Sequence, residues 1–209
     1  MSNSSTFDRQ VPRKLQYSLT KSVLENYKQA SRFCFRNFAL PQAKDLCGYF
    51  CRAKIEDDLP GIAVLFPTVT VSSRPYENNT GHYNEIASGS VRLTQSRILE
   101  PNTVPRQAKF RKTLAQYGQY VLFSSDGEPS EATYLYAILT HVVDINSEKR
   151  SWPAFIRIQF PNETCTKYVD EGIDLLMRFP DLRQEYIPSA ETIRQLQRRR
   201  IRRQAQGAA

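Results

Sequence analysis

The sequence predicts an α+β domain, and two patterns carry that prediction. Residues 18–38 repeat apolar side chains at helical spacing, whereas residues 131–145 carry apolar side chains on both faces of a strand. No internal repeat and no long apolar run is present to suggest another class of protein. We therefore expect an N-terminal helical hairpin, a central antiparallel sheet of about five strands and two C-terminal helices.

The helical hairpin is predicted from two consecutive amphipathic segments. The first, residues 18–38, has the spacing of a capping box and one apolar stripe, made of Val23, Tyr27, Ala30 and Cys34. The second, residues 42–56, has Pro41 at its start and is expected to end before Pro60. Residues 1–17 are polar and show no period, so we expect a mobile N-terminal arm.

The strands are predicted from β-branched and aromatic runs bounded by turn residues. They are expected at residues 61–71, 90–99, 117–124, 131–145 and 152–160. Residues 72–88 read as a long polar loop, which is a length typical of functional or mobile segments. Residues 131–145 are expected near the middle of the sheet. On one face they present Tyr134, Tyr136, Ile138 and Val142, and on the other Leu135, Ala137, Leu139, Val143 and Ile145.

The C-terminal part is predicted to hold a short helix and a basic one. The short helix covers residues 170–179 and is expected to end at Pro180. The basic helix begins with Ser189 as its N-cap. Its apolar face is poor, because Ile193, Leu196 and Ile201 spread over about 140° and Arg200 falls among them. The domain organisation that follows is an arm at 1–17, a single α+β domain at 18–188 and a basic C-terminal helix or tail at 189–209.

The net charge of +8 is confined to the two ends of the chain. Residues 1–60 carry 10 basic and 6 acidic side chains, residues 61–180 carry 12 of each, and residues 181–209 carry 7 basic and 3 acidic ones. A neutral centre with basic flanks suits a scaffold that presents its flanks to an anion. Solubility alone is the simpler explanation of the same charge.

Three basic clusters are candidate nucleic-acid-binding elements. The first lies on the helix face opposite the apolar stripe and consists of Lys21, Lys28, Arg32 and Arg36. The second follows a proline-bounded turn and consists of Arg106, Lys109, Arg111 and Lys112. The third is the terminal helix, with Arg194, Arg198, Arg199, Arg200, Arg202 and Arg203. Six arginines repel one another, and a nucleic-acid backbone would remove that repulsion.

The function predicted from these clusters is non-enzymatic nucleic-acid binding within a nucleoprotein assembly, with no cofactor and no metal. Four aromatic side chains lie among these basic residues, namely Tyr27, Phe33, Phe35 and Phe110. They can either stack on unpaired nucleotides or belong to the core. RNA or single strands are favoured over duplex DNA because the sequence contains no recognisable recognition helix. The alternative is a structural or adaptor protein whose basic helices bind an acidic protein partner.

Other chemistry receives less support from the sequence. Cys47 and Cys51 share one helix side and suggest a metal site, but buried packing is the favoured explanation. His82 with Glu85, or His141 with Asp144, could form a base with an orienting carboxylate, although a structural role is the simpler one.

Membrane binding and location are predicted from what the chain lacks. No apolar run reaches the ~18–20 residues that a membrane span needs, and the arginine stretch has no Trp or Phe to insert into lipid. Four cysteines with no signal-like N-terminus favour a cytoplasmic protein. A nuclear location is the alternative, because residues 198–203 resemble an import signal.

Overall fold

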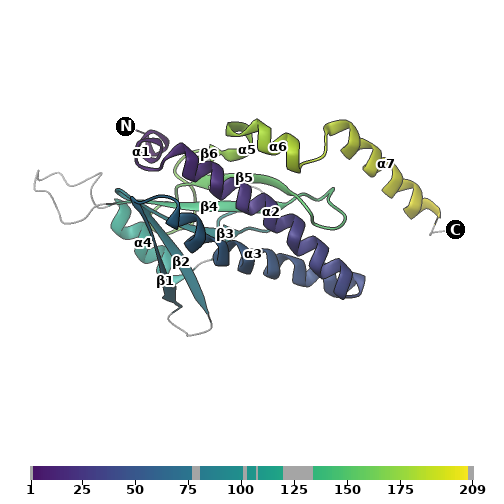
Figure 1. Cartoon of the computed structure of the whole chain (residues 1–209), viewed down its shortest axis with the longest axis horizontal. Helices are drawn as coiled ribbons and strands as arrows, with labels where there is room; N and C mark the ends of the chain where they lie inside the picture. Colours follow the sequence, from purple (N-terminus) through teal and green to yellow (C-terminus); the bar gives the residue numbers. More distant parts are fainter. Residues whose placement is uncertain (1, 77–80, 101–102, 107, 120–133, 207–209) are drawn as a thin grey trace, which may run out of the picture.

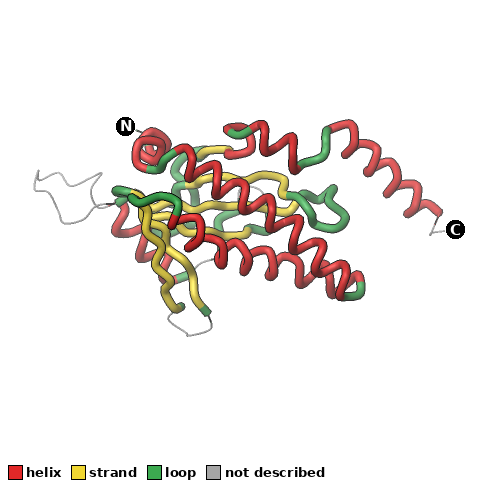
Figure 2. The backbone as a smooth tube through the Cα atoms, viewed as in Figure 1, coloured by secondary structure: helices red, strands yellow, loops and turns green. Residues whose placement is uncertain are grey.

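The computed structural model describes residues 2–76, 81–100, 103–106, 108–119 and 134–206, and for residues 117–119, 200 and 203–206 it describes the backbone alone. It confirms the α+β class, since two long helices cross one face of a sheet and further helices follow the sheet in the chain (Figure 1). Figure 2 shows the strands as one continuous layer with the helices beside it. The segment between the predicted strands at 117–124 and 131–145 lies outside the described residues.

The sheet has six strands and is mixed rather than antiparallel. Its strands are β1 (Val69–Pro75), β2 (His82–Ser88), β3 (Val91–Arg97), β4 (Leu135–Val143), β5 (Pro153–Gln159) and β6 (Ile173–Asp174), which are neighbours in that order. The pair β3–β4 is parallel, and every other pair is antiparallel. Parallel strands need a crossover connection, and the segment between β3 and β4 provides it, because it contains α4 (Lys109–Gln119). The prediction of an all-antiparallel sheet is therefore wrong.

The expected N-terminal arm is instead packed helix. Helix α1 (Asn3–Gln10) is capped by the Ser2 side chain, which accepts from Ser5 N, and α2 (Arg13–Asn37) begins three residues after α1 ends. Phe7 is fully buried, and its ring meets Phe160 edge-on with 6.0 Å between centroids. The apolar residues Phe7, Val11 and Leu15 recur at helical spacing, but Pro12 interrupts the pattern and hides it in the sequence.

Helix α3 (Leu40–Val64) continues through Pro60, where the sequence predicted its end. A proline within a helix leaves the carbonyl four residues earlier without its usual donor. Here that carbonyl belongs to Glu56, and it accepts a 2.7 Å hydrogen bond from Asn84 Nδ2 on β2. The Asn84 backbone N–H also donates to Glu56 Oε2 at 2.9 Å. Strand β2 thus supplies the hydrogen bond that Pro60 removes.

This contact gives a prediction for stability. Asn84→Ala should lower the free energy of unfolding by about 1–2 kcal/mol, because the Glu56 carbonyl loses the donor that replaces the missing helical N–H in a half-buried site. Pro60→Ala restores a backbone N–H, so the double variant should recover most of the loss. Urea unfolding of the two single variants and the double variant measures this coupling. Strictly additive effects would show that Asn84 does not replace the missing helical bond.

Several other boundaries differ from the sequence prediction. Residues 72–88, expected to be a loop, contribute most of β1 and β2, which form an antiparallel pair. Residues 61–64 belong to α3 rather than to a strand, and residues 117–119 belong to α4, while 120–124 lie outside the described residues. After β6, the chain forms the short helices α5 (Leu175–Arg178) and α6 (Pro180–Tyr186) before α7 (Ala190–Gln206). Pro180 opens α6 instead of only closing the helix before it.

The two faces of β4 confirm the predicted alternation. Ala137 and Leu139 point into the main core, which α2 and α3 cover. Tyr136 and Ile138 point to the other face, where they pack with Leu114 and Ala115 of α4. Helix α4 therefore lies on the side of the sheet opposite α2 and α3, and this separates the basic residues carried by these helices.

Candidate nucleic-acid interface

The predicted basic row on α2 divides into two parts. Lys21 forms a 3.9 Å ion pair with Glu25, and Lys28 Nζ lies 4.0 Å from the centroid of the Tyr186 ring of α6. Arg32 and Arg36, on the last turns of α2, are exposed. Within the described part of the chain, neither of these two arginines forms an ion pair. The C-terminal half of α2 therefore presents two unneutralised guanidinium groups.

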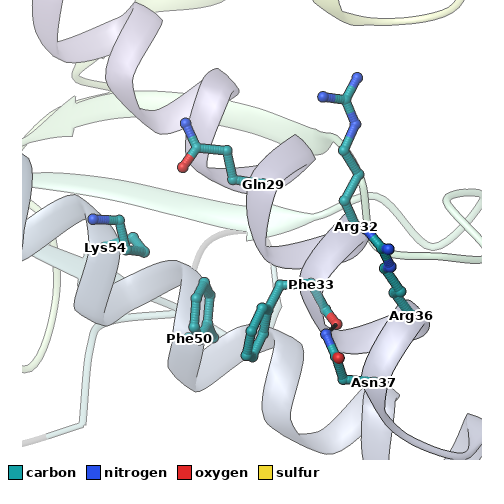
Figure 3. Close-up of a pocket in the computed structure, with 7 residues that line it drawn as sticks. All are labelled: Gln29, Arg32, Phe33, Arg36, Asn37, Phe50 and Lys54. Carbon is teal, nitrogen blue, oxygen red and sulfur yellow. Dashed lines mark hydrogen bonds between the residues drawn. The ribbon is translucent and has the colours of Figure 1, made fainter.

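These two arginines border a groove between α2 and α3, which we call the arginine groove. Its lining comprises Gln29, Arg32, Phe33, Arg36, Asn37, Phe50 and Lys54, and its volume is about 520 Å³. Figure 3 shows Phe33 of α2 against Phe50 of α3, with the arginines projecting beyond them. The two rings are stacked, with centroids 4.6 Å apart and planes 13° apart. Phe33 remains 45% exposed, so a large aromatic surface faces solvent beside the positive charge.

The charge in the arginine groove is all of one sign. The lining includes two arginines and one lysine but no carboxylate, although Lys54 Nζ is held by Asp57 at 2.7 Å. Arg32 and Arg36 are four residues apart on one helix, an arrangement that costs free energy between like charges. An anion bound between them would offset that cost. The groove thus combines what single-stranded nucleic acid needs, cations for phosphate and an aromatic face for bases.

Helix α7 carries the arginine stretch and contacts the body at few points. Ser189 caps it as predicted, accepting from Thr192 N at 3.2 Å. Ile193 and Leu196 are half-buried, and Gln197 Nε2 donates a 2.7 Å hydrogen bond to Asn146 Oδ1 in the β4–β5 connection. Arg194, Arg198, Arg199 and Arg202 are exposed, whereas the side chains of Arg200 and Arg203 lie outside the described ones.

A second concavity, the α7 cleft, lies between α7 and the β4–β5 connection. Its volume is about 830 Å³, and it is lined by residues 143–152 together with Lys44, Leu99, Leu196, Gln197 and Arg199. Four basic side chains border it, namely Lys44, Lys149, Arg150 and Arg199. Two acidic side chains also line the cleft, Asp144 and Glu148, so the net charge of the lining is positive.

The third predicted cluster lies elsewhere. Arg106, Lys109 and Lys112 are exposed at or before α4, on the sheet face opposite α2. Arg111 is only 8% exposed, and its guanidinium donates to Ser96 Oγ at 3.2 Å and to the Arg106 carbonyl at 2.9 Å. The prediction that Arg111 is a surface binding residue is therefore wrong. Its side chain holds the segment before α4 against β3.

Two of the three predicted elements come together. The α2–α3 turn, the β4–β5 connection and α7 all lie at one end of the molecule, and α4 lies towards the other end (Figure 1). Lys44, Lys149 and Arg150 add to this end, although they are not among the predicted binding residues. Only packing brings them beside α7. Lys149 and Arg150 lie between the predicted strands at 131–145 and 152–160, and that position was the one signal that could have indicated them, whereas Lys44 on α3 had none.

His141 belongs to a buried hydrogen-bonded chain between α2, β4, β3 and α3. Glu56 Oε1 accepts from Gln95 Nε2 at 2.8 Å, which leaves the Gln95 amide oxygen to accept from His141 Nε2 at 3.2 Å. His141 Nδ1 then accepts from the Tyr27 hydroxyl at 3.0 Å. Burial, with Arg97 and Arg52 nearby, lowers the pKa of His141 to about 3. His141 is thus a neutral, fully buried side chain with a structural role, and its partner is not Asp144.

The cysteines are buried, as the sequence favoured. Cys34, Cys47 and Cys51 lie in the main core between α2 and α3. Burial raises the pKa of Cys47 to about 11 and also raises that of Cys51, so both are protonated thiols at neutral pH. Among the residues that the structure describes, no group of three metal-ligating side chains is found.

In the described part of the chain, no helix combines the length and the apolar character needed to cross a membrane. No protein-family model, curated protein or solved structure matches the chain.

Proposed function

We propose that this chain is a non-enzymatic nucleic-acid-binding protein that binds RNA or single-stranded DNA. The observation that carries the proposal is the arginine groove, where two unpaired arginines border an exposed aromatic stack. Arginine side chains supply phosphate contacts, and each contact releases counterions from the strand. The basic surface around α7 extends the same electrostatic attraction over one end of the molecule. A role within a nucleoprotein assembly is part of the proposal.

The aromatic surface favours unpaired strands over duplexes. Bases in a duplex already stack on one another, whereas an unpaired base gains about 1–3 kcal/mol by stacking on an aromatic side chain. Phe33 offers such a surface in the groove that Arg32 and Arg36 also line (Figure 3). A protein that used only phosphate contacts would not discriminate between the two forms in this way.

Binding across a salt series tests the proposal. Fluorescence anisotropy with a labelled RNA, the same DNA strand and its duplex should show the single strands bound more tightly, and affinity should fall as salt rises. Deleting residues 194–209 removes six arginines and should make the salt dependence shallower, by roughly 0.7 in the slope of log K against log salt for each lost contact. Affinity that is independent of salt, or unchanged by the deletion, would refute this function.

A specific observation also supports the adaptor alternative. Large apolar side chains are exposed around the α2–α3 turn, namely Phe38, Leu40, Leu46 and Tyr49. Tyr49 is 73% exposed, and clustered apolar side chains of this kind are typical of protein interfaces. Co-purification of a protein that stays bound after nuclease treatment and a high-salt wash would favour this alternative. Loss of all partners after nuclease alone would favour nucleic-acid binding.

A further inference from the structure

The aromatic side chain of Trp152 forms part of the wall of the α7 cleft. The residue is half-buried. Its indole Nε1 is enclosed by protein atoms and does not open into the cleft. What Trp152 offers to a bound molecule is therefore the apolar surface of its ring.

The rest of the lining suits a ligand with a flat apolar part and an anionic part. Val143 and Leu196 give half-buried apolar surface, and Leu99 adds an exposed side chain at the rim. Amide and hydroxyl groups of Asn146, Ser147, Ser151 and Gln197 lie in the same lining. Lys44, Lys149, Arg150 and Arg199 supply positive charge from α3, the β4–β5 connection and α7.

The loop that carries these groups is held in a fixed, strained conformation. Arg150 has φ of 54°, a left-handed value that is uncommon for a residue with a side chain. Hydrogen bonds hold it there, since Arg150 N donates to the Ser147 carbonyl at 2.9 Å and Ser151 N donates to Ser147 Oγ at 2.7 Å. Asp144 Oδ1 accepts a 2.7 Å hydrogen bond from the Asn146 backbone N–H. The loop therefore presents its cations on a preorganised backbone.

We propose that the α7 cleft holds one unpaired nucleotide of a bound strand, with the base against Trp152 and Leu196 and the phosphate facing Arg199, Lys149 and Arg150. The inference rests on the proposed function and adds to it a specific pocket for a single base. The cleft volume of about 830 Å³ is within the range of roughly 300–1,000 Å³ found for small-molecule sites. An inorganic phosphate alone would leave the apolar wall of Trp152 and Leu196 unused.

Trp152 is the single tryptophan of the chain, so its emission reports on this cleft alone. Titration of the full-length protein with AMP and with UMP should change that emission in a saturable manner. Adenosine and inorganic phosphate at the same ionic strength should produce a much smaller change, because adenosine lacks the phosphate and inorganic phosphate lacks the base. An equal response to phosphate would reduce the site to an anion site, and a response to polyglutamate but not to nucleotides would assign it to an acidic protein. Either result would overturn the proposal.

Two variants separate this cleft from general binding. Trp152→Leu removes the aromatic surface, and Arg199→Gln removes a charge; each should weaken binding of a labelled single strand by roughly 5- to 10-fold. The matched control is Arg183→Gln, on exposed surface of α6, which should bind as the wild type does. Circular dichroism verifies that all three fold. Tight strand binding that neither cleft variant affects would refute the pocket and leave the function standing, whereas no strand binding by the wild type would refute the function itself.

Discussion

Replacing Arg32 and Arg36 together with glutamine should lower the affinity for a single strand by roughly 10- to 30-fold at low salt. Both guanidinium groups border the exposed Phe33–Phe50 stack and have no ion pair among the described residues. If each contacts one phosphate, the salt dependence should also become shallower by roughly 0.7 in log–log slope for each arginine lost. Both side chains are exposed at the end of α2, so stability should change little.

The matched comparison removes the same charge from the other face of the sheet. Arg106→Gln with Lys112→Gln, near α4, should lower affinity by a much smaller factor, because these side chains lie away from the arginine groove. Anisotropy titrations at two salt concentrations compare the two double variants directly. Equal losses in both would mean that net charge, rather than this groove, determines binding.

His141→Gln should be strongly destabilising, with a loss of about 2–4 kcal/mol in the free energy of unfolding at pH 7. The wild-type imidazole joins Tyr27 to Gln95 inside the core, and it is 0% exposed. A glutamine cannot span both partners with the same geometry. Urea unfolding followed by circular dichroism measures the loss, and a change below 0.5 kcal/mol (about the scale of a surface substitution) would contradict this role.

The same residue sets a pH dependence whose sign follows from its pKa. The pKa of His141 is about 3 in the folded protein and about 6.5 in the unfolded chain, so the unfolded chain binds the proton first as pH falls. The contribution to stability is complete above pH 6.5 and is lost progressively as pH falls from 6.5 towards 3. Between pH 7 and pH 5 the loss is about 2 kcal/mol.

Comparison with His141→Gln isolates that contribution. Burial raises the pKa of Glu56, which has the opposite effect, because the folded form then holds the Glu56 proton more firmly. Since Glu56 is present in both proteins, its contribution largely cancels in the difference. The wild type should lose stability relative to His141→Gln as pH falls. Parallel pH profiles would show that His141 does not remain neutral in the fold.

The sequence predicted the elements whose pattern is local. The stripe of Val23, Tyr27 and Ala30 and the two-faced strand at β4 each follow from spacing within a few residues. What it could not predict depends on distant partners. Helix α3 passes Pro60 because Asn84 supplies the missing donor, and Asn84 gives no sign of this in its own segment.

The candidate site shows the same division. Exposed arginines on α2 and α7 were predictable from periodicity, but Arg111 has the same local pattern as its neighbours and is buried. The Arg111 side chain is buried because its guanidinium group donates to Ser96 on β3 and to the Arg106 carbonyl in the segment before α4. Of the residues around the α7 cleft, Arg199 was predicted, whereas Trp152, Lys44, Lys149 and Arg150 were not, because three parts of the chain must fold before they meet.

The first and last parts of the domain are tied together, and this affects how a newly made chain folds. Asp8 on α1 forms an ion pair with Arg178 on α5, 170 residues later, and Gln16 Oε1 accepts from the same arginine at 2.6 Å. Within this domain, α1 and α2 are synthesised before the residues that Phe7 and Tyr27 contact, which are Phe160 and His141. Helix α3 can cover part of the apolar face of α2 early, but the contacts with the sheet must wait for β4 and β5. Until then the nascent domain exposes apolar surface, which makes it prone to aggregation.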